Sequence, residues 1–106
     1  MLEDVTTLRK SVEQINEESE KENPNFNQLV RWVGNKETHA DRIMETVLNY
    51  YLAQRIKSDQ PHYEKKLVAL HEIVVLSMKV KQTSDAAVVD SLEEAVKTFQ
   101  MLYASK

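Results

Sequence analysis

Three histidines are the residues of this chain best suited to transfer a proton or bind a metal ion: His39, His62 and His71. Di-metal sites in helical bundles place a glutamate three residues before a histidine, and none of the three has that spacing. The sequence contains no cysteine, which excludes a thiolate nucleophile, a disulfide and a cysteine-type zinc site. It also lacks a glycine-rich phosphate loop. We therefore expect no catalytic residue, no metal and no cofactor.

His71 and Glu72 stand side by side in the most apolar stretch of the chain, LVALHEIVVLSMKV (67–80). On a helix, Glu72 falls on one line with Lys65 and Lys79, which predicts that it faces water. His71 projects about 100° away, so we expect it to face the interior or a partner. Because the two side chains diverge, they cannot act together on one substrate atom.

Arg55 and His62 are separated by six residues in RIKSDQPH. This spacing resembles the motif of HEPN-type ribonucleases, which are also helical bundles of about this size. The resemblance implies that Arg55 would hold an RNA phosphate and that His62 would move a proton. Ile56 stands where that motif usually has a polar residue. The alternative interpretation is an ordinary loop between two helices.

The composition favours a helical domain. A chain of 106 residues is long enough for one core, so we expect a single domain over residues 1–106. One glycine and two prolines are too few for the turns of a β protein. The formal net charge of −3, without a basic cluster, makes nucleic acid an unlikely partner.

Apolar residues at helical spacing predict five helices, whose ends are marked by capping residues. The predicted segments are a stripe over 5–15, a short helix over about 24–34, and longer helices over about 38–56, 62–81 and 86–102. Asn23 and Pro24 would begin the short helix, and Gly34 would end it. Ser58 or Asp59 would cap the helix over 62–81, and Thr83-Ser84-Asp85 would cap the last one. Short loops make neighbouring helices antiparallel. The predicted fold is all-α: an up-and-down antiparallel bundle of four long helices plus the short helix.

The helix predicted over 62–81 is apolar on nearly every side, which indicates burial on several sides or contact with another chain. We therefore predict a small non-enzymatic interaction or regulatory protein, of the inhibitor, adaptor or immunity type, that binds a protein partner or a second copy of itself. The ribonuclease is the alternative. The predicted contact residues are Trp32, Tyr50, Tyr51, Val68, Val75 and Met101.

The start of the chain, MLEDVTTLRK, is acidic and lacks the apolar core of a signal peptide. No apolar run reaches the length of about 18–20 residues that a membrane span needs. Together with the absence of cysteine, these features predict a cytoplasmic protein.

Overall fold

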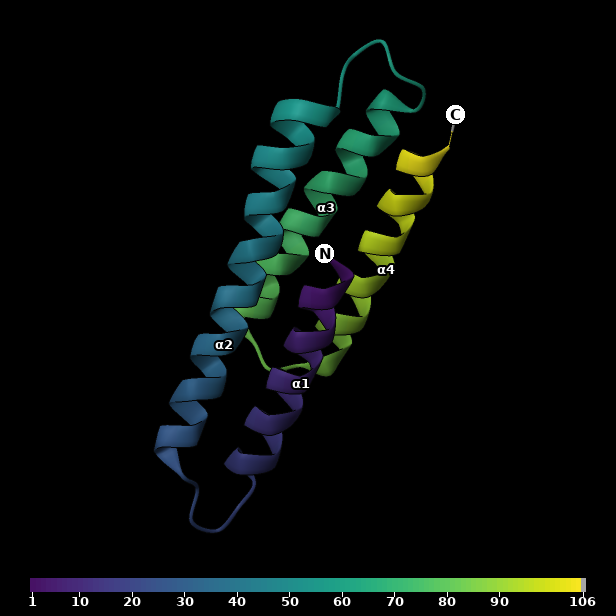
Figure 1. Ribbon diagram of the computed structural model, residues 1–106. Helices are drawn as coiled ribbons and strands as arrows, with labels where there is room; N and C mark the ends of the chain where they lie inside the picture. The colour runs from purple at the N-terminus through teal and green to yellow at the C-terminus, as the bar shows by residue number, and fades with distance from the viewer. Residues whose placement is uncertain (106) are drawn as a thin grey trace.

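The computed structural model describes residues 1–105, and all regular structure in that range is helical. The elements are α1 (Leu2–Ser19), α2 (Phe26–Glu45), η1 (Thr46–Arg55), α3 (Tyr63–Gln82) and α4 (Ala86–Ala104). Since η1 continues α2 without a break, the chain forms four long helical rods that alternate in direction (Figure 1). This confirms the predicted all-α helical bundle. None of the helices in the described part of the chain is both long and apolar enough to cross a membrane.

The rods pack in a ring, in which α1 contacts α2 and α4, and α3 contacts α2, η1 and α4. The bundle is elongated, with principal extents of 56 × 21 × 18 Å. In Figure 1, the α1–α2 hairpin projects beyond the other helices at one end, while η1 and the start of α3 extend to the opposite end. The N-terminus therefore lies midway along the bundle, beside α4 (Figure 1).

The core is built from one apolar stripe on each rod. Its members are almost fully buried and pack as a single cluster: Val5, Leu8, Val12, Ala40, Ile43, Val47, Ala69, Leu70, Ile73, Val80, Val89, Leu92, Ala95, Val96 and Phe99. Burial of a large aliphatic or aromatic side chain contributes about 1.5–3 kcal/mol, so this cluster is the main source of stability.

Gly34 does not end a helix, contrary to the prediction. α2 runs through it, and the predicted short helix over 24–34 joins the helix predicted over 38–56 into one rod. Asn25, rather than Asn23, begins α2, because its side chain accepts a hydrogen bond of 3.2 Å from the Gln28 amide. A glycine inside a helix costs about 0.5–1 kcal/mol. Burial of Ile43 and Val47 further along the same rod outweighs that cost.

The end of this rod, η1, is a π-helix, a rare form in which amides bond to carbonyls five residues back. Its last such bond joins the Ile56 amide to the Tyr51 carbonyl at 2.8 Å. The next helix, α3, begins at Tyr63, close to the predicted start, but neither Ser58 nor Asp59 caps it. His62 stands at the N-cap instead, with a left-handed backbone (φ 59°). The predicted cap at Asp85 is confirmed by a 2.9 Å bond from the Ala87 amide.

Candidate functional site

The histidine most engaged with its surroundings is His39, whose Nδ1 lies 2.8 Å from Asp4 Oδ1. Asp4 is in the first turn of α1 and His39 is near the middle of α2, so the antiparallel packing of these helices brings them together. Both side chains are largely buried, with 16% and 20% of their surface exposed. A histidine oriented by a carboxylate is an arrangement that can hold and transfer a proton. Nothing in the sequence pattern marked this pair, because 35 residues separate its members.

The other two histidines are separate from this pair. Both His62 and His71 are exposed. Of the two predicted environments of His71, the interior or a partner, the interior is therefore wrong. The turn of α3 that carries His71 directs it to the surface, as it does Glu72. Within residues 1–105, no group of three or more histidine, cysteine, aspartate or glutamate side chains is placed to hold a metal ion.

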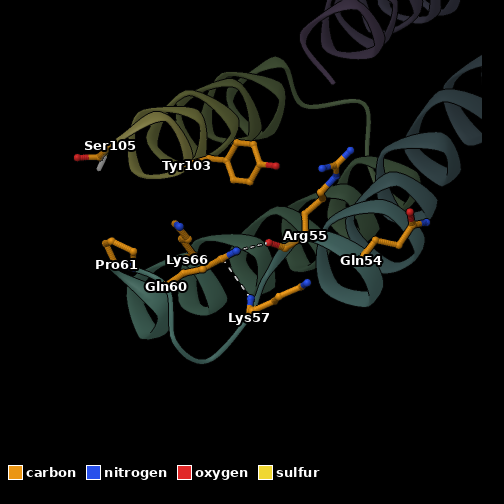
Figure 2. Close-up of a pocket in the computed structure, with 8 residues that line it drawn as sticks. All are labelled: Gln54, Arg55, Lys57, Gln60, Pro61, Lys66, Tyr103 and Ser105. Atoms are coloured by element: carbon orange, nitrogen blue, oxygen red, sulfur yellow. Dashed lines mark hydrogen bonds between the residues drawn. The ribbon is translucent and has the colours of Figure 1, made fainter.

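A basic cleft lies where the loop 56–62 faces the last turn of α4 (Figure 2). Its volume is about 640 Å³. The residues that line it are Gln54, Arg55, Lys57, Gln60, Pro61, Lys66, Tyr103 and Ser105. Three of the eight carry a positive charge and none carries a negative charge. This composition is notable in a chain whose formal net charge is −3.

The loop that forms one wall of the cleft is held by the Gln60 side chain. Gln60 Nε2 donates a hydrogen bond of 2.9 Å to the Arg55 carbonyl, and Gln60 Oε1 accepts one of 3.1 Å from the Lys57 amide (Figure 2). The left-handed conformation of His62, which histidine adopts more readily than most residues, then turns the chain into α3. The cations are thus carried by a constrained loop and by helices.

The cleft does not unite Arg55 with His62. His62 is exposed at the start of α3 and is not among the residues that line the cleft. The Arg55 guanidinium instead lies 5.2 Å from the centre of the Tyr50 ring, in a cation–π contact. The two residues therefore do not form the joint phosphate site that the HEPN motif implies.

Next to the cleft, Tyr51 makes edge-on contacts with three aromatic rings. Its ring centre is 4.9 Å from that of Tyr50, 4.7 Å from that of Phe99 and 5.2 Å from that of Tyr103. Burial, and to a lesser degree the neighbouring tyrosines, raise the pKa of the Tyr51 hydroxyl above its ordinary value. This cluster joins η1 to the end of α4 and supports the wall of the cleft.

The residues predicted to contact a partner come from three of the four rods: α2 with η1, α3 and α4. Met101 and Val68 are 75% and 67% exposed, and Tyr50 and Val75 are about two-fifths exposed. Trp32 and Tyr51 are half-buried. Trp32 lies on the projecting part of α2, where the Lys10 ammonium is 6.0 Å from its ring centre. The role of these six residues as partner contacts stays a prediction.

Comparison with known proteins identifies the class. The family described as nickel-containing superoxide dismutase matches residues 1–106, which is the whole sequence. The chain therefore belongs to the nickel-containing superoxide dismutase family. No curated protein and no solved structure gives a significant match.

This membership corrects several predictions. The family is one of enzymes, so the predictions of a non-enzymatic, regulatory interaction protein and of the alternative HEPN-type ribonuclease are wrong. The expectation of no metal among its partners is wrong for the same reason, because the family is named for nickel. The interaction-protein prediction rested on a broadly apolar helix and on the absence of catalytic motifs, and absent motifs did not exclude an enzyme. The ribonuclease alternative rested on the spacing of Arg55 and His62 alone.

The residues present do not fit a nickel centre by themselves. Nickel in proteins takes imidazole, thiolate or other nitrogen and oxygen donors, commonly four in a square plane. The sequence has no thiolate, and the described residues bring no three histidine or carboxylate side chains together. His39 Nδ1 is also already paired with Asp4.

Proposed function

We propose that this chain functions in superoxide dismutation as the helical body of a nickel-containing superoxide dismutase. The observation that carries the proposal is the family match over residues 1–106. Because the described side chains do not fit nickel, the proposal includes metal donors other than these side chains. Nickel, when bound, would supply the electron exchange with superoxide.

The contribution that we assign to the chain's own residues is proton handling. Dismutation converts two superoxide anions and two protons into hydrogen peroxide and dioxygen, so a proton donor is required. His39, held by Asp4 at 2.8 Å, is the best oriented proton-transfer group in the described residues. We propose that the ring nitrogen not facing Asp4 delivers a proton, while Asp4 keeps the ring in position.

We further propose that residues 1–106 work as one helical domain and that the protein is cytoplasmic. A shared apolar core contributed by all four rods supports the first point. Because the sequence has no cysteine, the fold needs no disulfide, and this is compatible with the reducing environment of the cytoplasm.

Superoxide decay, followed by stopped-flow absorbance, tests the function. The protein is isolated through a tag from the cells that normally make it, so that any further donor remains in place. We expect it to accelerate the decay, and we expect a strong nickel chelator to abolish the acceleration until nickel is restored. A protein that leaves the decay unchanged before chelation would refute the proposal.

A further inference from the structure

Two lysines in this chain are equally buried, but only one of them has a partner. Lys36 and Lys66 each expose 4% of their surface. Lys36 Nζ donates a hydrogen bond of 2.8 Å to the Thr83 carbonyl. Lys66 Nζ makes no hydrogen bond or salt bridge with any other described residue, and its nearest aromatic contact is the Tyr103 ring, at 5.8 Å from the centre.

Most of the Lys66 side chain is covered, but its ammonium group still reaches solvent in the cleft: among the described residues, Ser77 Oγ is the side-chain atom that is fully buried without a hydrogen-bond partner. Charges on largely buried side chains in folded proteins are nearly always paired, and the protein supplies no acceptor for this one. Lys66 lines the basic cleft, and Figure 2 shows it between the loop and Tyr103. Its missing acceptor is thus expected to be a group that enters the cleft.

The rest of the cleft indicates the charge of that group. Arg55 and Lys57 lie on its rim, both exposed, and no salt bridge among residues 1–105 involves either. Tyr103 and Ser105 add two hydroxyl groups to the lining. Three cations and two hydroxyl donors, without a carboxylate, favour an anion with several acceptor oxygens and more than one negative charge.

We propose that this cleft is a binding site for a phosphate group, with Lys66 as the buried anchor and with Arg55 and Lys57 as the outer cations. The arginine suits the bidentate geometry of phosphate oxygens, and the lysines act as point charges. A volume of about 640 Å³ is within the range of small-molecule sites and exceeds the needs of an inorganic ion. The site therefore suits a small phosphate ester. It involves no nickel and does not depend on the proposed dismutase activity.

A structural role for the same cations is the competing explanation. Both η1 and α4 end beside the cleft, and the free carbonyls at a helix C-terminus attract positive charge. If Lys66 only neutralises these carbonyls, its removal lowers stability whether or not phosphate is present. If it is an anchor for phosphate, its removal leaves the stability nearly unchanged when phosphate is absent, because the ammonium then contacts only the solvent of the cleft.

The test measures thermal unfolding in phosphate-free buffer and with added inorganic phosphate or AMP, against sodium chloride at the same ionic strength. We expect both probes to raise the Tm of the wild type more than the chloride does. Lys66→Met, which keeps the aliphatic stem, should have a Tm close to that of the wild type without phosphate and should lose the phosphate response. Lys36→Met, the matched buried lysine, should keep the response.

Calorimetric titration completes the test. Lys66→Met should weaken phosphate binding by about tenfold or more, as expected for a lost charge-assisted hydrogen bond. Lys57→Gln changes only an exposed residue and so should fold, and it should weaken binding severalfold. A larger response to AMP than to phosphate would identify an ester as the ligand class. The proposal is overturned if the wild type shows no phosphate-specific response, or if Lys66→Met and Lys57→Gln both bind phosphate as the wild type does.

Discussion

His39 Nδ1 lies 2.8 Å from Asp4 Oδ1, and this contact joins the first turn of α1 to the middle of α2. Within residues 1–105, no other histidine forms a hydrogen bond or a salt bridge with a carboxylate. The pair combines a structural link between two helices with a group that can donate a proton. These two roles lead to separate predictions.

The proton role predicts a loss of activity in His39→Gln. Glutamine keeps a polar side chain but cannot serve as a general acid, so we expect the rate constant for superoxide decay to fall by about tenfold or more. His71→Gln is the matched control, because His71 is exposed and should leave the rate unchanged. Equal rates in the two variants would show that His39 does not deliver the proton.

The structural role predicts a loss of stability in Asp4→Asn. The substitution replaces the carboxylate of a largely buried pair, and we expect the free energy of unfolding in urea to fall by about 1 kcal/mol. Glu3→Gln removes a charge from the adjacent, exposed position and should change the stability by less than about 0.5 kcal/mol. Similar losses in both variants would point to a general effect of charge near the start of α1 instead.

The fold was largely predictable because apolar spacing alone determines which face of each helix is buried. The stripe of Val5, Leu8 and Val12 and the cap at Asp85 are examples of local signals that the structure confirms. The continuity of α2 through Gly34 was not predictable in this way, because it depends on burial further along the rod.

The candidate sites were much less predictable. The Asp4–His39 contact and the cleft around Lys66 join residues that lie far apart in the sequence, and only the packing of the helices brings them together. Lys66 had no local pattern that distinguished it from the exposed Lys65 beside it. The family, in turn, was not evident from motifs, since the sequence offers no cysteine and no metal-ligand spacing.

Lys36 gives the protein a defined pH dependence. Burial lowers the pKa of its ammonium group below the ordinary value of 10.5, and nearby Glu37 opposes this shift only in part. The folded state therefore binds fewer protons than the unfolded state at a pH between the lowered pKa and 10.5. In that window, stability contributed through Lys36 rises with pH, because the cost of burying the charge disappears.

Comparison with Lys36→Met isolates this contribution from the titration of other groups. We expect the wild type to gain stability relative to the variant as the pH rises from 7 toward 10.5, as measured by urea unfolding at each pH. A difference that is constant over this range, or that moves in favour of the variant, would show that Lys36 is not buried as a charged group.

Gly34→Ala tests the continuity of the long rod. The glycine lies inside α2, its φ is not positive, and an added Cβ would meet no atom of the described residues within 4 Å. Alanine should therefore stabilise the protein by about 0.5–1 kcal/mol, mainly by reducing the freedom of the unfolded chain. A destabilisation of this size in urea unfolding would indicate a left-handed glycine at a helix end.

The most direct test of the whole account is the nickel content of the chain when it is produced alone. The purified 106-residue protein is equilibrated with Ni²⁺ and passed through a desalting column. The nickel that remains per protein chain is then measured by elemental mass spectrometry. Because the described side chains form no group of three metal donors, we predict that nickel is not retained in proportion to protein and that superoxide decay is not accelerated. One retained nickel ion per chain, together with dismutase activity, would contradict the proposal that further donors complete the centre.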